Sequence, residues 1–148
     1  MEPLERLIQD AVTGEIKADR ACLLIVGQDD SSRHVIVDQV ESTGHVCLVT
    51  DSLEEARDIL EAHDAVDALM IDANHGGREA IRLIREAQNR VPWIRAMVWS
   101  DHLDPMQTLE AIREGASDYL VIPTDIDRIN TRLDQLLDRV RSARNNEN

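Results

Sequence analysis

From residue 21 onward, short apolar runs alternate with longer segments in which apolar residues recur every three or four positions. The short runs predict buried β-strands at residues 21–26, 46–49, 68–71, 94–98 and 119–121. The longer segments predict helices at residues 32–42, 53–62, 78–87 and 105–114, and a last one from about residue 125. Repeated strand–helix units favour a parallel sheet with helices on both faces, because each crossover connection is right-handed.

Two of these helices carry apolar residues at a spacing that places them on one side, where we expect them to face the sheet. In the helix at 78–87 they are Ile81, Leu83 and Ile84. In the helix at 105–114 they are Met106, Leu109 and Ile112. With five strands, the leading architecture is α/β, a doubly wound, flavodoxin-like parallel sheet in the order 2-1-3-4-5.

The strand predicted at 68–71 is followed directly by an acidic residue, Asp72. In the order 2-1-3-4-5 the topological switch point lies between strands 1 and 3, where open α/β sheets bind their ligands. The loops that meet there are Gly27-Gln28-Asp29-Asp30 and Asp72-Ala73-Asn74. Their oxygens suit a hard cation such as Mg²⁺, and the candidate ligands are Asp29, Asp72 and Asn74. The alternative is that these are ordinary solvated loop residues.

The length of 148 residues is that of one domain. We expect this domain over residues 21–143, preceded by an N-terminal helical extension at 1–20 and followed by a polar tail at 144–148. The apolar stripe of the extension fits packing on the domain or a homodimer contact. The last helix offers the same two alternatives, because its apolar residues follow a heptad-like spacing. They are Ile126, Ile129, Leu133, Leu136 and Val140.

The formal net charge of −13 argues against a nucleic-acid surface, because phosphate binding needs clustered positive charge. No apolar stretch is long enough to span a membrane and no signal segment begins the chain, so we expect a cytoplasmic protein. Cys22 and Cys47 fall in apolar runs, where small buried thiols are ordinary. The five histidines lack metal-ligand spacing, so we predict no zinc site.

The chain resembles the receiver domain of two-component response regulators, most closely in the segment Gly115-Ala116-Ser117-Asp118-Tyr119-Leu120-Val121-Ile122-Pro123. Ser100 precedes Gly115 by fifteen residues and occupies the place of the family's serine or threonine at the end of strand 4. Asp72 occupies the place of the phospho-accepting aspartate. The resemblance extends from residue 21 to about residue 140 and implies the CheY-like form of the flavodoxin-like fold.

The resemblance implies a signalling domain, with at most self-catalysed phosphotransfer and dephosphorylation, and not a classical enzyme. Asp72 would accept the phosphoryl group, and Ser100 and Tyr119 would form the switch pair. The implied partners are a sensor histidine kinase or phosphotransfer protein, and a protein target bound by the face of helix 4, strand 5 and helix 5. Mg²⁺ is the implied cofactor.

Three positions depart from the family pattern. Gly27 and Gln28 stand where receivers carry two acidic residues, and Ile122 stands where they carry a lysine that contacts the phosphoryl group. The only lysine, Lys17, lies in the N-terminal segment. A charge-assisted hydrogen bond of this type is worth about 1.5 to 3 kcal/mol. We therefore expect an atypical receiver, either a weak phospho-acceptor or a pseudo-receiver that signals by binding alone.

A flavodoxin-like cofactor-binding protein is a second class to consider, because the same fold serves unrelated functions. Flavin binding needs a phosphate-cradling loop after the first strand and aromatic faces around the ring. The loop after the first strand is acidic here, and the aromatic residues of the chain are Trp93, Trp99 and Tyr119. The sequence therefore favours signalling over cofactor binding.

Overall fold

The computed structural model describes residues 3–5, 20–62, 65–74 and 77–146, and all five predicted strands form. They are β1 (Cys22–Val26), β2 (Val46–Thr50), β3 (Ala68–Asp72), β4 (Arg95–Ser100) and β5 (Asp118–Val121). Neighbouring strands are parallel and their order is β2-β1-β3-β4-β5. The predicted flavodoxin-like topology is therefore confirmed.

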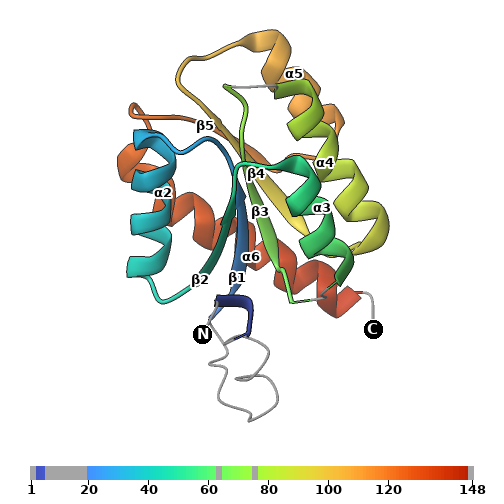
Figure 1. The fold of residues 1–148 in the computed structure, drawn as a ribbon. Helices are drawn as coiled ribbons and strands as arrows, with labels where there is room; N and C mark the ends of the chain where they lie inside the picture. The colour runs from blue at the N-terminus through green and yellow to red at the C-terminus, as the bar shows by residue number, and fades with distance from the viewer. Residues whose placement is uncertain (1–2, 6–19, 63–64, 75–76, 147–148) are drawn as a thin grey trace.

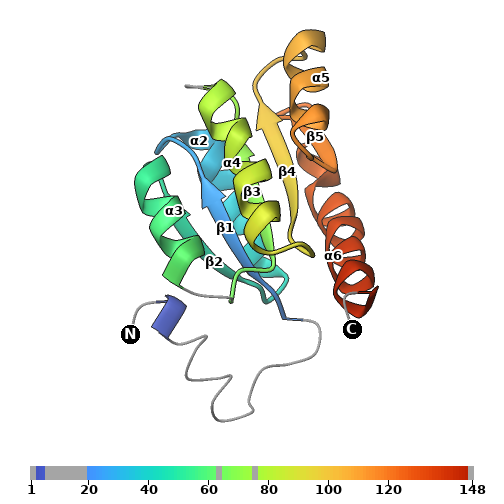
Figure 2. The ribbon, with the colours of Figure 1, turned by 90° about the vertical axis from the view of Figure 1, so that its right-hand side faces the viewer.

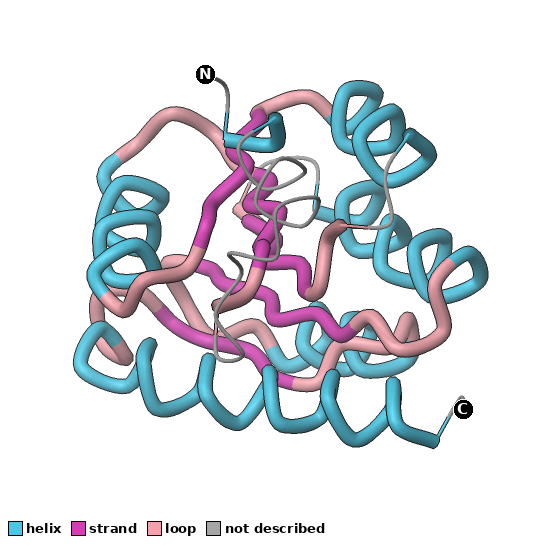
Figure 3. The backbone as a smooth tube through the Cα atoms, turned by 90° about the horizontal axis from the view of Figure 1, so that it is seen from below, coloured by secondary structure: helices cyan, strands magenta, loops and turns pink. Residues whose placement is uncertain are grey.

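The helices that connect the strands cover both faces of the sheet. They are α2 (Ser31–Ser42), α3 (Leu53–Ala62), α4 (Gly77–Arg90), α5 (Pro105–Arg113) and α6 (Ile129–Asn146), with a short 3-10 helix, η1 (Ile126–Arg128), before α6. Figures 1 and 2 show α2 and α6 on one face and α3, α4 and α5 on the other. Figure 3 shows α6 running along one side of the strands. No helix within the described residues is long and apolar enough to cross a membrane.

Each face of the sheet has its own apolar layer, because successive side chains of a strand point to opposite faces. The layer under α3 and α4 includes the predicted inward residues of α4, each fully buried: Ile81, Leu83 and Ile84. The layer under α2 and α6 includes the heptad-like residues of α6: Ile129, Leu133, Leu136 and Val140. The pattern in α6 is thus covered within the chain, as the packing alternative predicted.

The helix predicted at 105–114 forms as α5, but the expectation that its apolar residues face the sheet is wrong. Met106 is 73% exposed, Ile112 58% and Leu109 41%. The fully buried residue of α5 is instead the small Ala111.

The position of α5 explains this reversal. The helix stands over β5 at the edge of the sheet and packs mainly against α4 and β5, so most of its circumference has no neighbour to cover it. Ala111, together with the half-buried Gln107, fills the narrow contact. The open side of α5, with the residue just before the helix, is called here the apolar face of α5: Leu103, Met106, Leu109 and Ile112.

The predicted N-terminal helix falls largely on residues 1–2 and 6–19, which lie outside the described residues. Leu4 belongs to the short described helical piece at 3–5 and packs against the layer under α3 and α4. At the other end, α6 continues to Asn146, through most of the predicted polar tail.

The two cysteines are free thiols buried in separate layers, Cys22 under α3 and α4 and Cys47 under α2 and α6. Burial raises the pKa of each thiol to about 12. Both act as small core residues, as their place in apolar runs indicated.

Candidate functional site

Asp72 is the last residue of β3, the central strand of the sheet, and it is only 3% exposed. Its Oδ1 accepts a hydrogen bond from the backbone N–H of Asn74 at 2.8 Å. This local turn orients the carboxylate at the carboxyl edge of the sheet, beside the switch point between β1 and β3. The structure thus places Asp72 where ligand sites of open α/β sheets lie.

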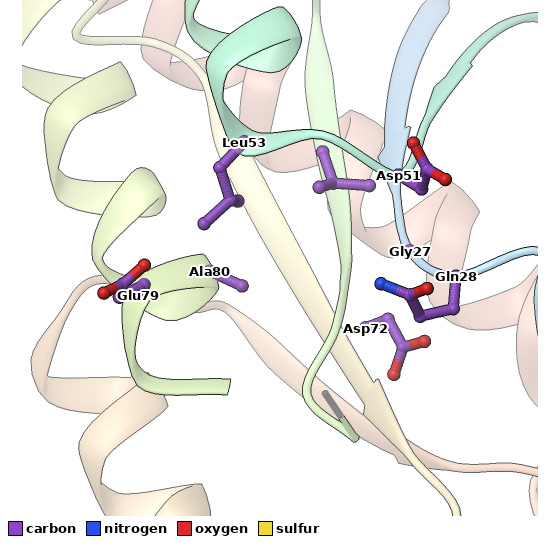
Figure 4. Close-up of a pocket in the computed structure, with 8 residues that line it drawn as sticks. Gly27, Gln28, Asp51, Leu53, Asp72, Glu79 and Ala80 are labelled. Atoms are coloured by element: carbon purple, nitrogen blue, oxygen red, sulfur yellow. The ribbon is translucent and has the colours of Figure 1, made fainter. Parts of the chain in front are cut away.

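A cleft of about 220 Å³ opens beside Asp72, between the loops that follow β1 and β2 and the start of α4. Figure 4 shows Gln28 and Asp72 on one side of the cleft and Glu79 on the other. The lining residues are Val26, Gly27, Gln28, Asp51, Leu53, Asp72, Glu79 and Ala80. Asp51 and Glu79 were missed by the sequence reasoning, although Asp51 directly follows β2 and the edge argument used for Asp72 would have found it.

Gly27 lies against Asp72 with no room for a side chain. A Cβ at this position would stand 2.8 Å from the Asp72 Cβ and 2.9 Å from the Cζ2 of the Trp99 indole. Trp99 is fully buried, and its Nε1 donates to the Ser32 hydroxyl at 3.1 Å. The Gly27 carbonyl accepts from Arg33 Nη1 at 2.9 Å. Packing against Asp72 and Trp99 and the hydrogen bond from Arg33 therefore fix the position of Gly27.

The two aspartates that follow Gln28 are engaged at the start of α2. Asp29 is 69% exposed and its carboxylate pairs with Arg33 at 3.1 Å and His34 at 2.7 Å. Asp30 is the N-cap of α2 and accepts from the Arg33 backbone N–H at 3.1 Å and the Ser32 hydroxyl at 2.7 Å. Neither aspartate lines the cleft that Asp72 lines.

Ser100, at the end of β4, is fully buried and bonded to the loop that carries Asp72. Its hydroxyl donates to Asn74 Oδ1 at 3.1 Å, and the Asp101 backbone N–H donates to the same oxygen at 2.8 Å. The Asn74 side chain is therefore turned toward β4. The structure brings Asp72, Asn74 and Ser100 together at one edge of the sheet, as their positions after strands predicted.

Tyr119, on β5, is half-buried and its hydroxyl donates to Gln107 Oε1 at 2.6 Å. Burial raises the pKa of the Tyr119 phenol, an effect that the nearby Ser100 hydroxyl partly offsets. Gln107 Nε2 donates in turn to the backbone carbonyl of Ala73 at 3.0 Å. The sequence reasoning missed Gln107, because it belongs to no motif and lies on the side of α5 that the apolar pattern assigned to solvent.

Comparison with known proteins identifies the family. A family model of the response regulator receiver domain matches residues 23–134, most of the chain. The chain belongs to the response regulator receiver domain family. It is therefore a receiver domain of two-component signalling, and the predicted resemblance is confirmed.

The curated relatives of this receiver are transcriptional and response regulators. It is 28% identical over 118 residues to the DNA-binding transcriptional regulator NtrC of Klebsiella pneumoniae, covering 80% of this chain and 25% of NtrC. It is 30% identical over 103 residues to the response regulator protein FleR of Pseudomonas aeruginosa, covering 70% of this chain and 22% of FleR. The chain thus spans about a quarter of the length of these relatives.

Solved structures agree with the fold. A response regulator from Thermotoga maritima matches with a TM-score of 0.72 at 20% identity, covering 80% of this chain and 98% of that one. A CheY-like receiver domain protein from Methanospirillum hungatei matches with a TM-score of 0.71 at 16% identity, covering 84% and 98%.

Receiver domains generally bind Mg²⁺ at an acidic pocket, but the donors in this receiver do not fit such a site. Of the three predicted ligands only Asp72 lines the cleft, since Asp29 is ion-paired outside it and the Asn74 side chain is bonded to Ser100 and Asp101. Across the described residues, no group of three or more His, Cys, Asp or Glu is placed to hold a metal ion.

The residue at the position of the family lysine also differs from the family pattern. Ile122 is 3% exposed, packs in the layer under α2 and α6, and donates its backbone N–H to the Ser100 carbonyl at 2.8 Å. An apolar side chain thus lies in the core where receivers have a cation. Lys17, the single lysine, lies outside the described residues.

Proposed function

We propose that this receiver accepts a phosphoryl group on Asp72 from a sensor histidine kinase or a phosphotransfer protein. The observation that carries the proposal is the Asp72 carboxylate itself, oriented by the Asn74 N–H at 2.8 Å and lining a cleft at the sheet edge. A carboxylate oxygen attacks phosphorus while the bond from phosphorus to the donor breaks, and the donor leaves with the electron pair. The product is an acyl phosphate on Asp72.

The phosphoryl oxygens would then draw hydrogen-bond donors toward Asp72. The buried Ser100 hydroxyl, which donates to Asn74, is positioned to change its acceptor, because hydrogen bonds to charged oxygens are stronger than those to an amide. Tyr119 is on β5, the strand beside β4, which ends at Ser100. Ser100 and Tyr119 therefore act as the switch pair in this proposal.

The receiver would bind its target protein through the face made by α5, β5 and α6. The apolar face of α5 is already open there, with Met106 73% exposed and Leu103 69% exposed. Exposed apolar clusters of this kind mark protein-interaction sites. The target is a protein, either a separate partner or an output domain. The relative NtrC, of which the matched segment covers 25%, is long enough to contain such a domain.

A second candidate is a pseudo-receiver that binds its partner without phosphorylation. It is favoured by the filled position beside Asp72, where Gly27 admits no acidic side chain, and by the buried Ile122 in place of a lysine. The first feature removes a carboxylate that would help to hold Mg²⁺, and the second removes a cation; both Mg²⁺ and a lysine would neutralise charge on a phosphoryl group. In this version the apolar face of α5 serves as a permanent docking surface.

Intact-protein mass spectrometry after incubation with acetyl phosphate separates the two candidates. The wild type and Asp72→Asn are compared with and without Mg²⁺ in the buffer. A single phosphoryl adduct in the wild type that is absent from Asp72→Asn supports the phospho-acceptor. No adduct in either protein, and no change in thermal stability with beryllofluoride, rejects it in favour of the pseudo-receiver.

A further inference from the structure

Gln107, in the first turn of α5, hydrogen-bonds to two separate parts of the molecule. Its Nε2 donates to the Ala73 carbonyl at 3.0 Å, and its Oε1 accepts from the Tyr119 hydroxyl at 2.6 Å. A carbonyl oxygen only accepts, so the Ala73 contact decides which end of the amide faces it and leaves the amide oxygen to the phenol. One side chain thus joins the residue after Asp72 to the tyrosine on β5.

The surrounding backbone is built around this amide. Gly77, the first residue of α4, has no side chain, and a Cβ there would lie 2.8 Å from Gln107 Nε2. The Gln107 backbone N–H donates to Oδ1 of Asp104, the N-cap of α5, at 3.1 Å. The starts of α4 and α5 therefore both help to place the amide between Ala73 and Tyr119.

The Ala73 N–H bonds the loop after β3 to the Trp99 carbonyl at 2.8 Å, and side-chain hydrogen bonds connect this loop to its surroundings along two further routes. The Asn74 side chain leads to Ser100 and Asp101 at the end of β4. The Ala73 carbonyl leads through Gln107 to α5, the helix that carries the apolar face. The second route reaches the surface to which the proposed function assigns the output.

We infer that Gln107 is a positioning residue that couples the loop of Asp72 to Tyr119 and to the start of α5. A change at Asp72 that moves the Ala73 carbonyl weakens a hydrogen bond made by the same amide that holds the Tyr119 hydroxyl. The amide, the phenol and the first turn of α5 then shift together. The inference rests on the proposed function for its natural input, phosphorylation, but the bridge itself exists without a phosphoryl group.

Three variants and one matched control test the bridge. Gln107→Glu keeps an acceptor for Tyr119 but loses the donor to Ala73, whereas Gly77→Ala displaces the amide without changing Gln107 or any charge. Tyr119→Phe keeps the Ala73 half. The matched control is Gln88→Glu, because the Gln88 amide also donates to backbone carbonyls, at Ile94 and Gly115, at the other end of α4.

The readout is the NMR signal of carbon-13 placed at the ζ carbon of tyrosine, which is unique because Tyr119 is the only tyrosine. The input is Asp72→Asn, which alters the side chain before Ala73 and needs no phosphorylation. For each background the displacement of the tyrosine signal caused by Asp72→Asn is measured. Tyr119→Phe has no tyrosine signal, so the amide proton signals of the first turn of α5 are measured instead.

We expect Asp72→Asn to displace the tyrosine signal in the wild type and in Gln88→Glu. The displacement should be at least threefold smaller in Gln107→Glu and Gly77→Ala, while Tyr119→Phe retains the response of the first turn of α5. An undiminished displacement in Gly77→Ala, or none in the wild type, would overturn the inference.

Thermal unfolding confirms that each variant is folded. If Gln107→Glu does not fold, Gly77→Ala alone tests the bridge. Failure of the wild type to form the phosphoryl adduct rejects the proposed function alone.

Discussion

Gly27 and Trp99 together occupy the space where an acidic side chain would stand beside Asp72. The indole is fully buried under the site and comes within 2.9 Å of any Cβ at position 27. Position 27, directly after β1, therefore has no room for an acidic side chain. Asp29 and Asp30 bond instead to groups at the start of α2. The absence of an acidic residue at position 27 therefore follows from the packing of Trp99 against this position.

A side chain at position 27 should therefore destabilise the protein. Gly27→Ala forces the Asp72 backbone or the indole to move, and overpacking of this kind costs about 1 to 3 kcal/mol. Urea unfolding should show this loss. Gly77→Ala is the comparison and should cost less, because its new Cβ comes closer than 3 Å only to the end of the Gln107 side chain and not to a buried ring. If Gly27→Ala is as stable as the wild type, or if Trp99→Leu does not relieve the loss, the packing argument fails.

The site residues differ in how visible they are in the sequence. Asp72 and Ser100 could be placed at the sheet edge because each follows an apolar run that forms a strand. Gly27 and Gln107 act through contacts with residues distant in the chain, Trp99 and Ala73, and no local pattern encodes such contacts. Charge and motif therefore locate the edge of the site, while packing decides which side chains reach it.

Among the helices, α5 is the most lightly attached. It buries Ala111, whereas the neighbouring α4 buries five residues. Its links to α4 include the ion pairs Arg78–Glu110 at 3.2 Å and Arg85–Glu114 at 2.9 Å. Exposed pairs of this type contribute little to stability. Few buried apolar contacts give an element a low local opening free energy, which suits a helix that passes on a signal.

Substitutions on the two helices should have unequal effects on stability. Met106→Ser and Ile112→Ser, on the apolar face of α5, should change the free energy of unfolding by less than about 0.5 kcal/mol. Ile81→Ala and Leu83→Ala, on the buried face of α4, should each cost about 2 to 5 kcal/mol. Chemical denaturation measures both. A cost above 2 kcal/mol for Met106→Ser would show that α5 packs more deeply than its exposure indicates.

The elements themselves were predictable, but the facing of α5 was not. Each strand is a short apolar run because both faces of a parallel sheet are buried, and this gives a strong local pattern. An apolar stripe on a helix shows only that one side is apolar. Whether that side meets the sheet depends on neighbours, and at the sheet edge the side with Ala111 fits against α4 and β5 instead.

At the scale of the whole molecule, the two apolar layers each contain one buried thiol. Cys22 lies under α3 and α4, and Cys47 under α2 and α6. Burial raises the pKa of both thiols from 9.0 to about 12. A thiol that is harder to ionise in the folded state binds its proton more tightly there than in the unfolded chain. Its contribution to stability is therefore complete below pH 9 and declines as the pH rises toward 12.

The free energy of unfolding should consequently fall at alkaline pH, because the thiols in both layers ionise more easily in the unfolded chain. Since a difference of one pKa unit corresponds to about 1.4 kcal/mol, the two thiols together should remove about 3 kcal/mol between pH 8 and pH 10. Urea unfolding under reducing conditions at the two pH values measures this loss. The raised pKa of Tyr119 adds a loss in the same direction, beginning above its ordinary value of 10.0.

The doubly substituted Cys22→Ala, Cys47→Ala protein isolates the thiol effect from the other titrating groups. Its absolute stability will be lower, because both side chains are buried, but its decline from pH 8 to pH 10 should be about 3 kcal/mol smaller than that of the wild type. The single variants show how the loss divides between the two thiols, which are coupled because the charge of Cys47 helps to raise the pKa of Cys22. Equal declines in the wild type and the double variant would mean that the thiols ionise as easily in the folded protein as in the unfolded chain, and that the layers admit water at both sites.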